Sequence, residues 1–140
     1  MKQQRLGTYQ GHGAVSWTRI DMLLALYDAA LLELEKARIA HDQADHLLAK
    51  RHCIKALRVI CQLRSGVDPH YGDLSRQFDR LFEFVTTCIA GGSVANVADA
   101  VTVLSTLREG FEGIREEAVE MEKNGTIPPL EFTPTLEKLV

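Results

Sequence analysis

The residues with the clearest chemical capacity form the short run His41-Asp42-Gln43-Ala44-Asp45-His46. Imidazole and carboxylate groups are the ligands that zinc commonly takes from proteins. The run falls at a predicted turn between two helices, where such side chains are normally solvated. A di-metal centre in a helical bundle would need inward-facing Glu-x-x-His pairs, and the sequence has none. It also lacks a glycine-rich phosphate loop and a GxSxG nucleophile motif. We therefore predict no metal, no cofactor and no enzymatic activity.

A second candidate is His52, three positions before Lys55. The segment is similar to the His-x-x-Lys-Gly segment of histidine phosphotransfer domains, four-helix bundles that present the phosphoryl-accepting imidazole on an exposed face. We expect His52 to lie opposite the apolar stripe of its helix, as that role requires. Ala56 replaces the glycine that leaves room for a docking domain. Phosphotransfer through His52 therefore remains an alternative interpretation.

The composition is that of a single globular domain. The chain has 140 residues, 46% of them hydrophobic and 25% charged, which is enough to bury a core. A formal net charge of −3 without any Lys/Arg run argues against nucleic acid as a partner. The first residues lack a signal-peptide core, and no apolar run approaches the ~20 residues that span a bilayer. The three cysteines lack CxxC spacing and are expected to be free thiols. Together these observations predict a cytoplasmic protein without membrane insertion.

The spacing of apolar residues predicts four helices. The first is expected from about Trp17 to Asp42, with Ser16 as its N-cap. Its apolar arc spans roughly 200°, more than one neighbouring helix covers. This helix is therefore central, or it keeps part of its flank for something outside the chain. The other three are expected at about 44–65, 73–90 and 94–122.

Short connections make consecutive helices antiparallel neighbours, so the predicted fold class is all-α, an antiparallel four-helix bundle over residues 16–123. Residues 1–15 are polar and interrupted by glycines, which predicts a flexible N-terminal arm. Residues 124–140 contain Pro128 and Pro129 among apolar side chains. They are expected to form a tail that docks on the bundle or on a partner and can add a short helix after Pro134.

The apolar stripes of the later helices predict which side chains face the core. One flank of the second helix holds Leu47, Cys53, Ile54, Leu57, Ile60 and Cys61. One side of the third holds Leu74, Phe78, Leu81, Phe84, Val85, Cys88 and Ile89. In the fourth helix, Gly110 and Gly113 each cost about 1 kcal/mol relative to alanine. They lie beside the stripe near Phe111 and Ile114. We interpret them as positions where glycine is simply tolerated, as sites of close helix packing, or as a trough for a partner.

Several short strings follow one another in a characteristic order. They begin at Tyr9-Gln10, centre on Leu26-Tyr27-Asp28-Ala29-Ala30, and continue through Ile54-Lys55-Ala56, Leu81-Phe82-Glu83-Phe84 and the segment from Val101 to Phe111. Together they resemble the flagellar secretion chaperones of flagellin, the FliS family, whose central string is Leu-Tyr-Asp-Gly-Ala. The resemblance covers about residues 9–118. No single string is specific, but their order and spacing in one short all-helical chain are.

The chain departs from the family pattern at four places. Trp17 stands where proline usually follows the capping serine, and Gly91-Gly92 replaces an Ala-Asn pair. Ala29 replaces glycine, and Phe111 stands where tryptophan is typical. The last two lie on surfaces that a partner can use, so they bear on the details of recognition.

The resemblance implies a chaperone that binds the disordered C-terminal segment of flagellin in the cytoplasm, prevents premature polymerisation and delivers flagellin to the flagellar export apparatus. Such a segment is amphipathic and can fold as its apolar face enters a groove between helices. Further partners are expected at the export gate and among flagellar regulators, and the chain itself is expected to be a monomer or a weak homodimer. A helical adaptor or regulator of another system is the second alternative.

The expected partner contacts lie on the spare flank of the first helix, near the glycine trough and in the arm, which we expect to cover a groove when flagellin is absent. They are Tyr9, Gln10, Met22, Leu26, Tyr27, Asp28, Ile54, Leu57, Leu107 and Phe111. Leu26 and Tyr27 are equally well explained as core residues. Asp28 is expected to form a specific hydrogen bond to the arm or to a partner backbone.

Overall fold

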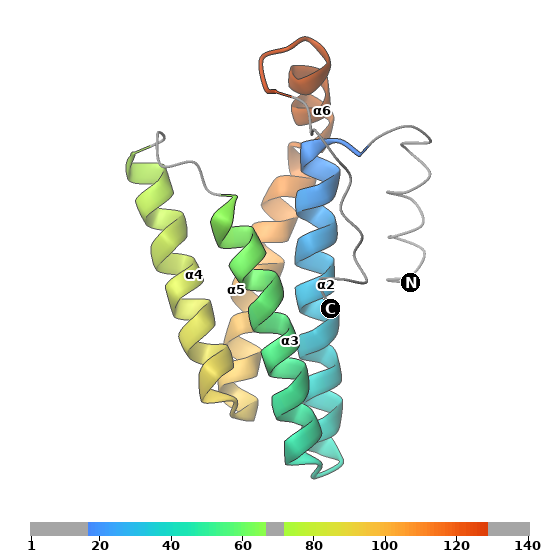
Figure 1. Cartoon of the computed structure of the whole chain (residues 1–140), viewed down its shortest axis with the longest axis vertical. Helices are drawn as coiled ribbons and strands as arrows, with labels where there is room; N and C mark the ends of the chain where they lie inside the picture. The colour runs from blue at the N-terminus through green and yellow to red at the C-terminus, as the bar shows by residue number, and fades with distance from the viewer. Residues whose placement is uncertain (1–16, 67–71, 129–140) are drawn as a thin grey trace.

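The computed structural model describes residues 17–66 and 72–128, and within these ranges it contains five α-helices and no strand (Figure 1). The helices are α2 (Arg19–Asp42), α3 (His46–Ser65), α4 (Asp73–Gly91), α5 (Val94–Gly113) and α6 (Arg115–Lys123). Helices α2 to α5 run side by side, and α6 lies beyond the end of α5 next to the start of α2. The predicted all-α bundle is confirmed.

Helix α2 is the central element of the bundle. It packs against α3, α5 and α6, and more than half of its residues are buried. It begins after Thr18, whose side chain accepts a hydrogen bond from the backbone N–H of Asp21 (3.2 Å). Thr18 is therefore the N-cap, and the prediction of Ser16 in that role was wrong.

Helices α2 and α3 pack closely because the side chains between them include small alanines. Ala30 and Ala37 of α2 and Ala49 and Ala56 of α3 are all buried. The connection is short, with Ala44 at a φ of 59°, and the Asp45 side chain caps α3 by accepting from the N–H of Leu48 (3.1 Å). The short turn makes the two helices antiparallel.

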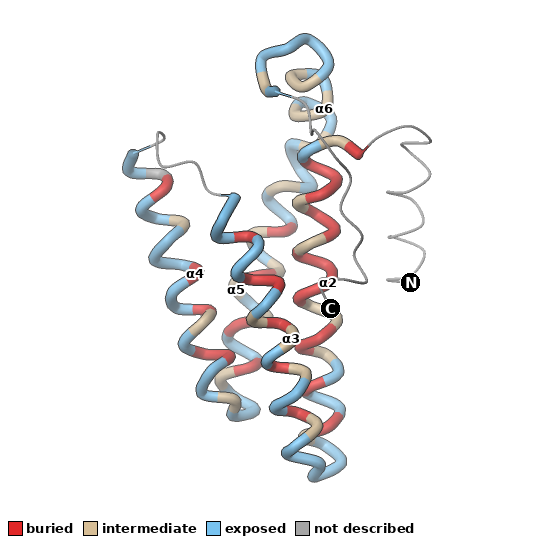
Figure 2. The backbone as a smooth tube through the Cα atoms, viewed as in Figure 1, coloured by how far each residue is buried: buried red, intermediate tan, exposed pale blue. Residues whose placement is uncertain are grey.

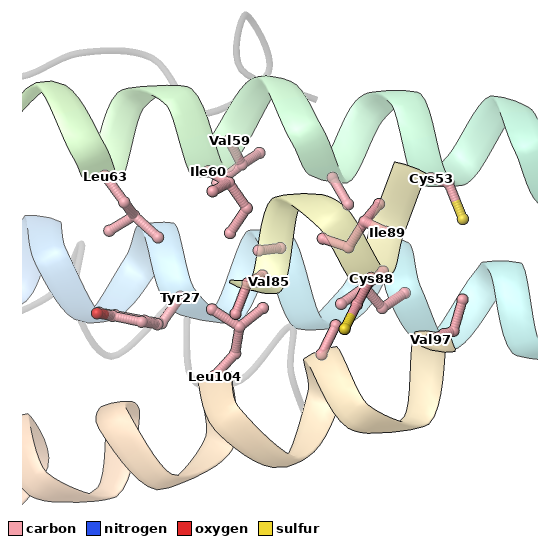
Figure 3. Close-up of a cluster of buried hydrophobic side chains, with 14 of the residues drawn as sticks. Tyr27, Cys53, Val59, Ile60, Leu63, Val85, Cys88, Ile89, Val97 and Leu104 are labelled. Atoms are coloured by element: carbon pink, nitrogen blue, oxygen red, sulfur yellow. The ribbon is translucent and has the colours of Figure 1, made fainter. Parts of the chain in front are cut away.

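The core lies between all four long helices. Figure 3 shows Tyr27 of α2, Ile60 of α3, Val85 of α4 and Leu104 of α5 converging in one cluster. Phe82, for which the sequence predicted no core position, is also buried there. On α4 the predicted stripe was partly wrong, because Leu81 and Phe84 are exposed, Phe84 by 48%.

The predicted flank of α3 also needs correction. Cys53 and Ile60 are buried as expected, but Leu47, Ile54 and Cys61 are exposed, and Leu57 is half-buried. The buried face is centred on Ala56 and includes Ala49, Val59 and Leu63. The prediction from large apolar side chains missed this face because alanines make up part of it.

The predicted fourth helix is interrupted at Ile114, so α5 and α6 are separate helices. Gly110 and Gly113 precede the break, and glycine is the poorest helix former after proline. The new direction brings α6 against α2, where the Glu122 side chain accepts a hydrogen bond from the backbone N–H of Arg19 (2.9 Å). An acidic group is favourable at this helix N-terminus.

The three cysteines are free thiols in different environments, and this predicts their reactivity. Cys61 is exposed, whereas burial raises the pKa of the Cys53 and Cys88 thiols. A raised pKa lowers the thiolate fraction, and the thiolate is the reactive species. Titration with a thiol reagent at pH 8 is expected to show one fast thiol and two that react only after denaturant is added. A Cys61→Ser variant should lose the fast phase, and a persisting fast phase would contradict the structure.

Candidate partner-binding groove

An apolar groove of about 490 Å³ lies where α2, the end of α3, the start of α4 and the α5–α6 junction meet. Its apolar lining includes Ile20, Met22, Leu23, Leu26, Tyr27, Leu63, Phe78, Phe82, Phe111, Ile114, Ala118 and Ile127. Arg19, Gln62 and Ser75 are the polar side chains among its lining residues. Four of the predicted contacts, Met22, Leu26, Tyr27 and Phe111, are brought together here.

An aromatic row from three helices forms part of the groove. The ring centroids of Tyr27 and Phe111 are 5.8 Å apart, those of Phe111 and Phe78 are 6.0 Å apart, and those of Phe78 and Phe82 are 6.3 Å apart. These separations are typical of favourable aromatic pairs. Burial raises the pKa of Tyr27, so its phenol stays neutral. Phe78 and Phe82 were missed as contact residues, although Phe78 was placed on the apolar stripe of its helix.

Gly110 and Gly113 do not mark close helix packing. A Cβ atom added at either position would meet no atom within 4 Å among the described residues. That interpretation of the glycines was therefore wrong. Ile114, directly after Gly113, is 49% exposed and lines the groove, so the α5–α6 junction leaves part of this apolar wall accessible.

A buried ion pair stands next to the aromatic row. Arg108 of α5 donates from Nε to Oδ1 of Asp28 (2.6 Å) and from a terminal nitrogen to Oδ2 (3.4 Å), and both side chains are buried. Asp28 does make a specific hydrogen bond, as expected, but its described partner is a side chain of the bundle. Arg108 was not predicted as the partner of Asp28. Its position beside Leu107, on the apolar stripe of the fourth predicted helix, was the available indication of a buried arginine.

A second ion pair holds α6 at the end of the groove. Arg115 donates from Nε to Oδ1 of Asp21 (2.7 Å) and from a terminal nitrogen to Oδ2 (3.1 Å), and Asp21 is buried. The Arg19 side chain also donates to the carbonyl of Pro128. Ile127 lines the groove, so the first part of the predicted tail contacts the bundle. Residues 129–140 lie outside the described residues.

The remaining predicted contacts lie elsewhere. Leu107 and Leu57 are partly buried against the core, and Ile54 is exposed on α3 and does not line the groove. Tyr9 and Gln10 lie outside the described residues, as does the arm that contains them.

His52 and His41 both have local partners. The His52 side chain is only 14% exposed, and its Nδ1 lies 3.4 Å from Oε1 of the buried Glu33. The expectation that His52 lies on an exposed face was therefore wrong. His41 Nε2 lies 2.8 Å from the carbonyl oxygen of Gly92. Among the described residues there is no group of three or more His, Cys, Asp or Glu that could hold a metal ion.

Comparison with protein families gives a match over most of the chain. The model of a protein family described as "Flagellar protein FliS" matches residues 1–118. Searches of curated proteins and of solved structures found no match. In the described ranges, no helix combines the length and apolar character needed to cross a membrane.

The Asp28–Arg108 pair generates a stability prediction. Removing one partner of a buried ion pair leaves an uncompensated charge, which typically costs about 3–5 kcal/mol. Arg108→Met is therefore expected to lower the free energy of unfolding, measured by urea denaturation, by that amount. The double variant Asp28→Leu/Arg108→Met should be more stable than Arg108→Met alone.

A matched control uses an exposed ion pair. Arg76 of α4 pairs with Asp73 at the surface, where such pairs contribute about 1 kcal/mol or less. Arg76→Met should therefore change stability little. Equal losses from Arg76→Met and Arg108→Met would contradict the importance given to the buried pair.

Proposed function

The chain belongs to the FliS family, a family of flagellar export chaperones, and on this premise we propose that its groove binds the disordered C-terminal segment of flagellin. The single observation that carries this proposal is the apolar groove with its aromatic row. An exposed apolar cavity of this kind is a typical binding site for a protein or peptide.

The volume of the groove limits how much of such a segment it can hold. An apolar cavity of about 150 Å³ holds one benzene molecule. The groove, with about 490 Å³, therefore has room for a few apolar side chains but not for a whole helix. We propose that an amphipathic segment lies across the groove and inserts side chains spaced three, four or seven residues apart.

The proposed contacts on α2 have the exposure that such binding needs. Leu23 and Leu26 are half-buried in the free chain, so a bound segment can remove their remaining surface from water. Each Å² of apolar surface removed contributes about 25 cal/mol before the cost of ordering the segment. Phe111 of α5 is also half-buried and supplies rigid aromatic surface, which is common at the energetic centre of interfaces, while the buried Tyr27 packs against it.

The proposed role in the cell follows from what is bound. A flagellin whose C-terminal segment is held in this groove cannot pair that segment with another flagellin, so premature polymerisation is prevented. We propose that binding occurs in the cytoplasm and that the complex is delivered to the flagellar export apparatus. The protein acts in this proposal by binding, without catalysis. The position of His52 does not favour the phosphotransfer alternative, because its ring lies against Glu33 of α2 and is mostly buried.

Binding can be measured with the C-terminal segment of flagellin from the same organism. Trp17 is the single tryptophan, and it packs in a buried cluster with groove residues Ile20 and Met22, so its fluorescence can report binding. Leu26→Gln places an amide in the groove and is expected to raise the Kd at least tenfold. Ile39→Gln is the matched control, since Ile39 is exposed on α2 outside the groove. It should leave the Kd unchanged.

Two results would contradict the proposed function. One is failure of the folded wild-type protein to bind the flagellin segment. The other is equal binding by Leu26→Gln and Ile39→Gln, provided that circular dichroism shows both variants folded. A flagellin segment with its apolar heptad positions changed to glutamine should not bind, which controls for nonspecific attraction.

A further inference from the structure

The outer face of α3 carries an apolar stripe that no described element covers. Leu47 is 64% exposed and Ile54 is 51% exposed, and Cys61 is exposed on the same side. These three residues are each seven positions apart, which returns a helix to within about 20° of the same direction. Figure 2 shows the exposed segments that recur along α3. A seven-residue repeat of this kind is typical of a surface that pairs with another helix.

The charged residues that α3 itself carries beside this stripe are all positive. The charged residues of α3 are Lys50, Arg51, Lys55, Arg58 and Arg64, and the helix contains no Asp or Glu. By helical rotation Lys50, Arg51 and Arg58 flank the stripe. None of these three has an ion-pair partner within the described ranges. The chain as a whole carries a formal net charge of −3, so this positive surface is a local feature.

The outer face of α3 is separate from the groove. Of α3, only Gln62 and Leu63 line the groove, together with Gly66 just after the helix. Ile54 and the buried Ala56 are two positions apart, which places them roughly 160° from each other around the helix. A partner on this face can therefore bind without entering the groove.

We propose that the outer face of α3 docks an acidic amphipathic helix of a second protein. Apolar side chains of that helix, in heptad spacing, pack on Leu47 and Ile54, while its flanking carboxylates pair with Arg51 and Arg58. Complementary charge beside an apolar seam sets the partner and orientation of paired helices. The proposal does not depend on flagellin binding, because the two surfaces share no residue.

Two other occupants fit the surface less well. An anionic membrane would be attracted by the charges, but two large apolar side chains give little area to insert, and stable anchoring generally needs more than one such signal. A second copy of the chain could offer acidic α6, yet that helix has no buried residue and no wide apolar face, and two of its side chains, Arg115 and Glu122, already contact α2.

The experiment uses the full-length protein and a fluorescein-labelled peptide of three heptads, with leucine at positions a and d and glutamate at e and g. Glutamate at e and g keeps the peptide from pairing with itself at neutral pH. A matched peptide has lysine at e and g. Fluorescence anisotropy is expected to show at least tenfold tighter binding of the acidic peptide, even though the net charge of the protein opposes it. Added salt should weaken this binding.

Variants of single surfaces test whether the acidic peptide binds on the outer face of α3. Arg51→Glu/Arg58→Glu is expected to raise the Kd of the acidic peptide at least tenfold, and Ile54→Gln should raise it severalfold. The matched controls are Arg76→Glu and Phe84→Gln, which change an exposed arginine and an exposed apolar residue on α4. These controls should leave the Kd unchanged. Circular dichroism verifies the fold of each variant.

The outcomes separate this proposal from the others. Equal binding of the two peptides, or equal effects of the α3 and α4 variants, would overturn it. Binding to phosphatidylserine vesicles in place of the acidic peptide, or dimerisation in sedimentation that the double variant abolishes, would assign the surface to a membrane or to a second copy. The double variant should still bind the flagellin segment, and Leu26→Gln should still bind the acidic peptide, so each proposal can fail alone.

Discussion

The interaction on which the groove depends is the buried ion pair between Asp28 and Arg108. Two charges taken out of water are tolerated only when each satisfies the other, so α5 can pack on α2 only in the register that joins them. That register sets Phe111 beside Tyr27 and thereby positions the aromatic row. We therefore expect the pair to contribute to the specificity of the arrangement as well as to its stability.

A second carboxylate of α2, that of Asp21, positions α6 in the same way. Asp21 and Asp28 lie seven positions apart on one side of α2, and their arginine partners, Arg115 and Arg108, are also seven positions apart. Helix α6 has no fully buried residue, and only Ala118 and Val119 pack on the apolar cluster around α2, so polar contacts with α2 add to a limited apolar contact in holding it in place. Apolar burial builds the bundle, and these ion pairs determine how its last helices close one end of the groove.

Periodicity alone predicted much of this structure. The wide apolar arc of α2 predicted either a central position or an uncovered flank, and the helix has both. Met22, Leu26, Tyr27 and Phe111 meet in the groove. The faces of α3 and α4 were less predictable, because alanine packing turned Ile54 outward and the same pattern fits either Phe82 or Phe84 as a core residue. The pairing of Asp28 with Arg108 depends on the register of helices 80 residues apart, which no local pattern contains.

The groove and the outer face of α3 give this small bundle two surfaces of different character, one apolar and aromatic, the other basic with an apolar seam. The groove is not built entirely from residues within the range of the family match. Ile127 and the carbonyl of Pro128 lie beyond residue 118, where the family match ends, yet the first lines the groove and the second binds Arg19 beside it. This edge of the cavity is thus set by a segment outside the family match, so a change of sequence there would reshape the groove without altering the bundle beneath it.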